Sequence, residues 1–247
     1  MRALILAAGE GTRLRPLTLD RPKPMLPIGG RPLLEHSIDL LRRHGIAEIA
    51  INLCYMPRAI VDHFGDGSDF GVAITYSPEE RLLGSAGAAR RLDWFFDDRF
   101  IVLYGDVLTN IDLGALVDKH GRHGALATLA LKDVPDPWGC GIARLAADGR
   151  IVRFVEKPNG LSMGSLANAG VYALEPEVLD LIPPERPYDF GRDVFPTMIE
   201  RRLPIYGHRT DDYVIDIGLP GRYEQAEADL RGGLFRQLCL SERRVYS

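Results

Sequence analysis

Cysteine is scarce in this sequence, with only Cys54, Cys140 and Cys239 among 247 residues. The three are widely spaced and form no CxxC pair, which argues against a disulfide framework and against a zinc site. We therefore expect reduced thiols in a cytoplasmic protein.

Long hydrophobic runs are absent as well. The apolar run at residues 3–8 is too short to cross a membrane, and no longer run follows it. The N-terminus also lacks the separate basic region, apolar core and cleavage site of a secretory signal. We expect no membrane partner.

An excess of positive charge is the third absence. The formal net charge is −4, so the chain has no overall basic field of the kind that marks nucleic-acid binders. Any phosphate ligand must therefore be held by a local cluster of cations, and nucleic acid is not expected as a partner. The apolar share of 46% and the charged share of 26% are ordinary for a globular protein.

Strand-like and helix-like segments alternate along the first 131 residues, which indicates an α/β protein with a mostly parallel sheet covered by helices. After residue 131 the pattern changes to short strands separated by turns, which predicts an antiparallel part. A helix is expected after Tyr223, broken at Gly232-Gly233. The expected strands are 3–8, 48–53, 72–76, 100–104, 125–131, 141–145, 151–156 and 169–174, and the expected helices are 33–44, 57–64, a stretch from 86, and 113–120.

The N-terminal strand leads into a glycine-rich, basic loop. Gly9 and Gly11 let the backbone turn tightly and approach a ligand closely, and Arg13, Arg15 and Lys23 follow. Backbone N–H groups in such a turn, together with fixed cations, are suited to polyphosphate. The loop therefore predicts a phosphate-handling protein.

Two common phosphate loops do not fit this segment. A Walker motif needs Gly-Lys-Ser/Thr, whereas Gly11 precedes Thr12 and Arg13; a dinucleotide fingerprint needs a third Gly or Ala where Leu14 stands. The prolines of residues 20–24 also disfavour a helix directly after the loop. We expect a strand followed by a long, proline-braced loop.

Residues 6–16 (LAAGEGTRLRP), with Pro22-Lys23-Pro24 after them, resemble the signature of the sugar-1-phosphate nucleotidyltransferases. The resemblance implies a Rossmann-like, mostly parallel mixed sheet flanked by helices, with a small antiparallel sugar-binding part. It implies a nucleotidyltransferase domain at 1–225, divided into 1–131 mainly for the NTP and 132–222 mainly for the sugar phosphate, and a helical tail at 226–247. No hexapeptide repeat is present, so no C-terminal left-handed β-helix is expected.

Two aspartates are candidates for metal binding. Asp106 follows the apolar run 100–104, at the carboxyl edge of the predicted sheet where ligands of open α/β folds bind. Asp216 lies in a second apolar run, where an unpaired carboxylate is costly and a partner such as a metal is expected. In the family this second aspartate is a metal ligand; Val214 and Leu219 depart from its usual aromatic residue and threonine. Both carboxylates suit Mg²⁺.

A Glu156-Lys157-Pro158 element, followed by Asn168, matches the sugar-binding element of the family. Strand alternation places Glu156 and Lys157 on opposite faces, but Pro158 ends the strand and lets the lysine swing across the pocket. The resemblance implies that Lys157 meets the sugar phosphate, while Glu156 and Asn168 bind sugar hydroxyls.

Weaker matches complete the pattern. Residues 83–88 resemble the stretch that lies against the nucleobase and ribose, with Ser85 in place of threonine. Cys140-Gly141 aligns with a Tyr-Gly pair that backs the sugar, so the missing tyrosine leaves the sugar packing open. Trp138 is either a stacking face or a core anchor, and Asp193 matches a variable acidic position whose role stays open.

The resemblance implies an enzyme that transfers a nucleoside monophosphate from an NTP to a sugar 1-phosphate and releases pyrophosphate. The branch of mannose-1-phosphate guanylyltransferases is the nearest, which favours GTP with mannose 1-phosphate or a related hexose or heptose phosphate. The alternatives are UTP with a muramic-type amino-sugar 1-phosphate, and a non-catalytic nucleotide-sugar-binding regulator; a homo-oligomer is left open. The candidate catalytic residues are Arg13, Lys23 and Asp106; the nucleotide-binding set is Leu6, Ala7, Ala8, Gly9, Gly11, Thr12, Arg13, Lys23, Gly84 and Ser85; the sugar-phosphate set is Gly141, Glu156, Lys157 and Asn168; the Mg²⁺ ligands are Asp106 and Asp216.

Overall fold

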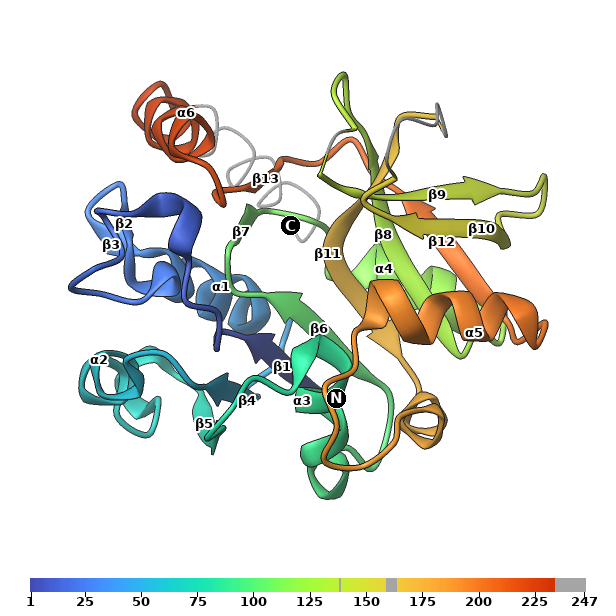
Figure 1. Cartoon of the computed structure of the whole chain (residues 1–247), viewed down its shortest axis with the longest axis horizontal. Coiled ribbons are helices and arrows are strands. Elements are labelled where there is room, and N and C mark those ends of the chain that lie inside the picture. The colour runs from blue at the N-terminus through green and yellow to red at the C-terminus, as the bar shows by residue number, and fades with distance from the viewer. Residues whose placement is uncertain (138, 159–163, 234–247) are drawn as a thin grey trace, which may run out of the picture.

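A mixed β-sheet with helices on both faces organises the chain in a computed structural model, which describes residues 1–137, 139–158 and 164–233 (Figure 1). Trp138 and Cys239 lie outside these residues. The main sheet has the order β10-β9-β11-β6-β1-β4-β5, and β8 joins β11 to β12. Its strands are β1 (Arg2–Leu6), β4 (Glu48–Leu53), β5 (Ala73–Pro78), β6 (Phe100–Tyr104), β8 (Ala127–Asp133), β9 (Gly141–Leu145), β10 (Ile151–Glu156), β11 (Leu166–Leu174) and β12 (Ile205–Arg209).

The sheet has a parallel half and an antiparallel half. Strands β6, β1, β4 and β5 run parallel to one another, whereas β11 runs antiparallel to β6, β8 and β9, and β10 runs antiparallel to β9. The predicted α/β class with a smaller antiparallel part is thus confirmed. Strand β12, which pairs parallel to β8, was not expected from the sequence.

Alternation along the strands gives the sheet a separate core on each face. In β1, Ala3 and Ile5 pack with α1, α2 and α4, whereas Leu4 packs on the opposite face with α3 and α5. Because successive strand side chains point to opposite faces, fully apolar strands can bury both faces in this way. The helices are α1 (Leu33–Arg43), α2 (Pro57–Phe64), α3 (Gly84–Arg91), α4 (Leu113–Arg122), α5 (Phe195–Glu200) and α6 (Pro220–Arg231).

A third, smaller apolar cluster joins the two ends of the described chain. Leu14 and Leu26 of the N-terminal loop pack with Ile217 and with Ala226 of α6. Figure 1 shows α6 beside the short hairpin of β2 (Pro27–Ile28) and β3 (Arg31–Pro32). The Tyr223 hydroxyl donates to the Pro27 carbonyl at 2.8 Å, so the loop is fixed by hydrogen bonding as well as by packing.

The described cysteines and helices bear on the disulfide and membrane expectations. Cys54 and Cys140 form no disulfide in the described residues. Among the helices that the structure describes, none is both long and apolar enough to span a lipid bilayer.

Candidate functional site

The N-terminal loop turns as its glycines predict. Gly11 has φ +68°, in the left-handed region that favours glycine, and the loop continues through two single 3-10 turns, Thr12–Leu14 and Lys23–Met25, rather than a long helix. Leu14 is buried and anchors the first turn. The loop therefore lies along the carboxyl edge of the parallel strands instead of capping a helix.

Lys23 is the charged centre of the site. Its side chain is only 9% exposed, and Nζ lies 2.5 Å from Asp106 Oδ2 and 3.6 Å from Asp216 Oδ1. Three residues predicted from separate parts of the sequence thus converge on one point. An ammonium shared by two carboxylates leaves acceptor capacity on both aspartates.

A short ladder explains why the two aspartates meet. Strand β13 (Val214–Asp216) pairs antiparallel with β7 (Val107–Thr109), with Asp216 opposite Val107. The backbone N–H of Ile217 also donates to the Asp106 carbonyl at 3.0 Å. Sequence patterns identified each aspartate, but this long-range pairing carries no local signal.

The electrostatics of the aspartate pair suit a divalent cation. Burial and the neighbouring Asp106 raise the pKa of Asp216, while Lys23 and the backbone N–H of Gly218 oppose the shift. A second positive charge would keep both carboxylates ionised, and carboxylate oxygens are the ligands that Mg²⁺ prefers. No group of three or more His, Cys, Asp or Glu able to hold a metal occurs within the described ranges. Two carboxylates alone fit Mg²⁺ only with substrate phosphates as further ligands.

Arg13 approaches the same point from the loop. A methyl group placed on Gly218 would lie 3.1 Å from Lys23 Nζ and 3.2 Å from Arg13 Nη2, so both cations lie beside this backbone. Arg13 lines the same cavity as Asp216 and Lys157. The structure therefore brings Arg13 close to the aspartate pair.

A cavity of about 260 Å³ opens beside the end of β1. Three predicted nucleotide-binding residues, Gly11, Thr12 and Arg13, do not line this cavity. All the other predicted nucleotide-binding residues do. These lining residues are Leu6, Ala7, Ala8, Gly9, Lys23, Gly84 and Ser85. Asp106 lines the cavity as well.

A buried polar network in this cavity was missed in the sequence. Asn52 accepts from the Ala7 N–H at 2.8 Å and donates to Glu79 Oε1 at 2.8 Å, and Glu79 Oε2 accepts from the Leu83 N–H at 2.9 Å. Both side chains are buried and line the cavity. The network locks the end of β1 to the segment before α3. A polar residue inside the apolar run 48–53 was the available signal.

Ser85 has its hydroxyl occupied within the protein. Its Oγ donates to Asp189 Oδ1 at 2.9 Å and accepts from the Phe190 N–H at 3.0 Å. The backbone N–H of Asp189 in turn donates to Asp193 Oδ2 at 2.8 Å. Asp193, whose role the sequence left open, thus fixes the backbone at Asp189.

A second cavity of about 410 Å³ adjoins the first, and the two share Tyr104, Asp106 and Asp189. It contains every predicted sugar-phosphate residue: Gly141, Glu156, Lys157 and Asn168. Strand β10 ends at Glu156, and Lys157 has φ +49°, so its side chain turns back into the cavity with Nζ 3.8 Å from Glu156 Oε1. The backbone thus turns after the strand ends, and Lys157 lines the cavity next to Glu156.

The Glu156 carboxylate lies between two glycines. A methyl group at Gly141 or at Gly191 would come within 2.6 Å of Glu156 Oε2, closer than real contacts allow. Burial raises the pKa of Glu156, while Lys157 opposes the rise. Apart from the Lys157 ion pair, the structure gives this carboxylate no hydrogen-bond donor among the described residues. The Glu156 carboxylate is therefore free to accept hydrogen bonds from hydroxyl groups of a ligand.

Asn168 and Arg222 also line the second cavity. Asn168 donates from Nδ2 to the Tyr172 hydroxyl at 2.6 Å and accepts from the Gly170 N–H at 3.0 Å, so its amide is held firmly. Arg222, at the start of α6, also lines the cavity and was not predicted. It interacts with Cys140, the residue in the place of the family tyrosine.

Known proteins are similar to this chain over nearly its whole length. A protein from Synechocystis named UTP--glucose-1-phosphate uridylyltransferase is 40% identical over 253 residues, covering 96% of this chain and 64% of its own length. The Mycobacterium tuberculosis mannose-1-phosphate guanylyltransferase is 38% identical, covering 94% of this chain and 65% of its own length. The chain thus spans slightly under two thirds of the length of these curated relatives. The structure of HddC from Yersinia pseudotuberculosis complexed with GMP-PN has a TM-score of 0.79 at 26% identity, covering 93% of this chain and 99% of that one. The family model of nucleotidyl transferases matches residues 2–232, and the chain belongs to that family.

Proposed function

We propose that this protein transfers a nucleoside monophosphate from an NTP to a sugar 1-phosphate, giving an NDP-sugar and pyrophosphate. The observation that carries the proposal is the pair of adjoining cavities, which meet at Asp106 beside Lys23 and Asp216. One cavity is lined by the glycine-rich loop and the other by Glu156 and Lys157. Two substrates bound in these cavities would meet beside Lys23, Asp106 and Asp216.

The chemistry needs positioning and charge neutralisation rather than a covalent intermediate. A sugar phosphate oxygen is already an anionic nucleophile for the α-phosphorus, and the main barrier is bringing two polyanions together. In this proposal Lys23 binds the α-phosphate, Arg13 binds the β- and γ-phosphates, and Lys157 binds the sugar phosphate. Glu156 accepts sugar hydroxyls. Asp106 and Asp216 would hold Mg²⁺, which supplies charge neutralisation to the phosphates.

GTP and mannose 1-phosphate, or a related hexose or heptose phosphate, are the substrates we favour. The similarity to a guanylyltransferase and to a structure containing GMP-PN supports a guanine nucleotide. UTP stays the alternative, with an amino-sugar phosphate or, from the Synechocystis relative, with glucose 1-phosphate. The five charged groups Arg13, Lys23, Asp106, Lys157 and Asp216 are all present, which disfavours a non-catalytic regulator.

Pyrophosphate release tests the proposal directly. Each of GTP, UTP, ATP and dTTP is mixed with Mg²⁺ and with mannose, glucose, muramic-type or heptose 1-phosphate. We expect one pair to release pyrophosphate far faster than the others, with GTP as the nucleotide. Preference for UTP would overturn the assignment of the base, and no release with any pair would favour the regulator.

Replacing Lys157 with Ala is expected to raise the KM for the sugar 1-phosphate roughly 10-fold and to leave the KM for the NTP nearly unchanged. The lost contact is a charge-assisted hydrogen bond at a half-exposed side chain, worth about 1.4 kcal/mol. Steady-state kinetics with each substrate varied in turn measures the effect. Lys119→Ala in α4, outside both cavities, is the matched control. Equal KM values for wild type and Lys157→Ala would remove Lys157 from the sugar-phosphate site.

A further inference from the structure

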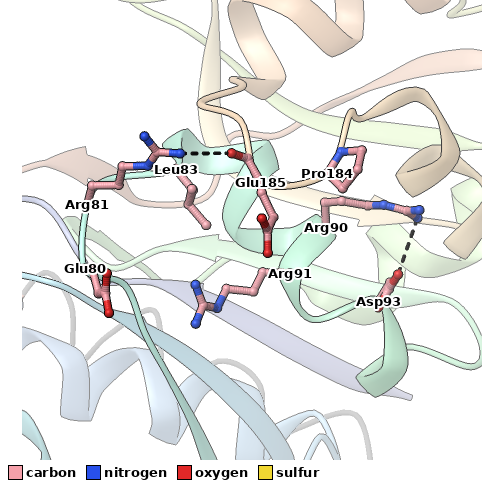
Figure 2. Close-up of a pocket in the computed structure, with 8 residues that line it drawn as sticks. All are labelled: Glu80, Arg81, Leu83, Arg90, Arg91, Asp93, Pro184 and Glu185. Atoms are coloured by element: carbon pink, nitrogen blue, oxygen red, sulfur yellow. Dashed lines mark hydrogen bonds and ion pairs between the residues drawn. The ribbon is translucent and has the colours of Figure 1, made fainter.

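A larger cavity lies behind α3 and shares no residue with the two substrate cavities. Its volume is about 820 Å³, within the range of small-molecule sites. Its walls come from the segment before α3, the end of α3 and the loop before Tyr188 (Figure 2). It is lined by Glu80, Arg81, Leu83, Arg90, Arg91, Asp93, Pro184 and Glu185.

The three arginines of this cavity are not equally engaged. Arg90 is directed toward Asp93, at 3.5 Å, and also lies 3.6 Å from Asp180, so its charge is balanced. Arg81 donates only to the Glu185 carbonyl, at 3.3 Å, which leaves its positive charge without a carboxylate partner among the described residues. Arg91 has no ion pair or hydrogen-bond acceptor for its guanidinium in that part of the chain. Guanidinium groups in this state suit bidentate binding of phosphate.

The carboxylates of Glu80 and Glu185 also border the cavity and, within the described ranges, form no ion pair. Glu185 has φ +52°, a left-handed conformation that costs a residue with a side chain of the order of 1 kcal/mol. Figure 2 shows its side chain turned toward Arg91. Carboxylates without partners can accept hydrogen bonds from hydroxyl groups. The cavity therefore offers both phosphate-binding and hydroxyl-binding groups.

The walls of this cavity continue directly into the substrate cavities. Glu80 and Arg81 are flanked by Glu79 and Leu82, which line the substrate cavity beside the end of β1. On the other wall, Glu185 is four residues before Asp189, which lines both substrate cavities. A ligand behind α3 would therefore contact two segments that each reach the substrates within a few residues.

Backbone hydrogen bonds tie these two segments together. The Tyr188 N–H donates to the Leu83 carbonyl at 2.9 Å, and the Tyr188 carbonyl accepts from Ala86 at 2.9 Å and from Gly87 at 3.0 Å. A methyl group on Gly84 would lie 2.5 Å from the Tyr188 carbonyl oxygen, so the backbones of Gly84 and Tyr188 are too close to admit a side chain. The loop that carries Glu185 is therefore tied to the start of α3 at Tyr188, three residues further along the chain.

We propose that this cavity is a binding site for a small phosphorylated sugar, and that its occupancy changes turnover at the substrate cavities. The phosphate binds between Arg81 and Arg91, and sugar hydroxyls bind to Glu80 and Glu185. The existence of the binding site is independent of the proposed function, whereas its effect on turnover rests on that function.

Amide hydrogen exchange tests the binding. The probes are inorganic phosphate and glucose 6-phosphate, a phosphorylated sugar with no phosphate at C1. We expect glucose 6-phosphate to protect the amides of residues 90–93 and 185–186, which lie outside the substrate cavities, and to bind more tightly than phosphate alone. Arg91→Ala is expected to weaken this protection about 10-fold, the loss of one charge-assisted contact. Arg58→Ala, which removes an exposed charge from α2, is the matched control.

Protection confined to segments of the substrate cavities, or equal protection in Arg91→Ala, would overturn the site. Equal affinity for the two probes would overturn the role of Glu80 and Glu185. The effect on turnover is measured as the change in the rate of pyrophosphate release when glucose 6-phosphate is added. We expect Arg91→Ala to lose this change and to keep the basal rate of release. Binding without any such change would overturn regulation. If no substrate pair releases pyrophosphate, the exchange experiment still decides whether the site exists.

Discussion

Replacing Asp106 with Asn is expected to lower the turnover number roughly 10³-fold while leaving the fold intact, on the scale of losing one preorganised electrostatic group. The amide has nearly the shape of the carboxylate, so packing at the end of β6 is preserved. What changes is charge: Lys23 keeps only Asp216 as an anionic partner, and one of the two carboxylates proposed to hold Mg²⁺ is lost. Pyrophosphate release at saturating substrates measures the loss.

The dependence on metal concentration distinguishes a lost ligand from a general defect. Asp106→Asn should require a higher Mg²⁺ concentration for half-maximal release, and the thermal midpoint of unfolding should stay near that of the wild type. Asp39→Asn removes a carboxylate paired with Arg42 at the surface of α1 and serves as the control. Near-normal turnover in Asp106→Asn would remove this residue from the metal site.

The second large effect is expected from Gly191→Ala, which should lower kcat/KM for the sugar 1-phosphate by roughly 10²-fold. The backbone φ of Gly191 is not positive, so alanine fits its conformation. Its methyl group, however, would lie 2.6 Å from Glu156 Oε2 and 3.2 Å from Glu156 Cδ. The carboxylate must move out of its position, and a displacement of about 1 Å at a substrate-positioning group costs on the order of 10²-fold.

Gly221→Ala is the matched control, because a methyl group at Gly221 meets nothing within 4 Å. The NTP should retain its KM in Gly191→Ala, since the clash is confined to the sugar cavity. Glu156→Gln keeps the shape and removes the charge, which separates displacement of the group from loss of the acceptor. Unchanged sugar kinetics in Gly191→Ala would show that Glu156 does not position the sugar.

Much of the fold follows from local sequence, because apolar runs and turn residues mark single elements. The bounds of β4, α2, β6, β9 and β10 agree with those expected from the pattern. Strand β12 was missed because Gly207 interrupts its short apolar stretch, and its partner β8 lies far away in the sequence. Pairing between distant segments is decided by tertiary packing, which single-sequence periodicity does not contain.

The site divides in the same way. Lys23, Asp106, Glu156 and Lys157 stand in recognisable motifs, and the structure brings them into two adjoining cavities. The Asn52–Glu79 network and Arg222 were missed because a single polar residue in an apolar strand, or an arginine at a helix start, has an ordinary structural explanation. Gly191 was equally silent, because only its closeness to the Glu156 carboxylate shows why a glycine stands there, whereas Gly141 had been predicted from its motif.

The small cluster beneath α6 bears on how the protein matures during synthesis. Lys23 and Asp106 leave the ribosome well before Asp216, and the ladder of β7 with β13 cannot form until residues 214–216 are available. A nascent chain that has completed only its parallel strands therefore holds half of the aspartate pair. We expect catalytic competence to arise only after residues 214–231 have been made, when α6 closes over the N-terminal loop, rather than as each earlier strand is added.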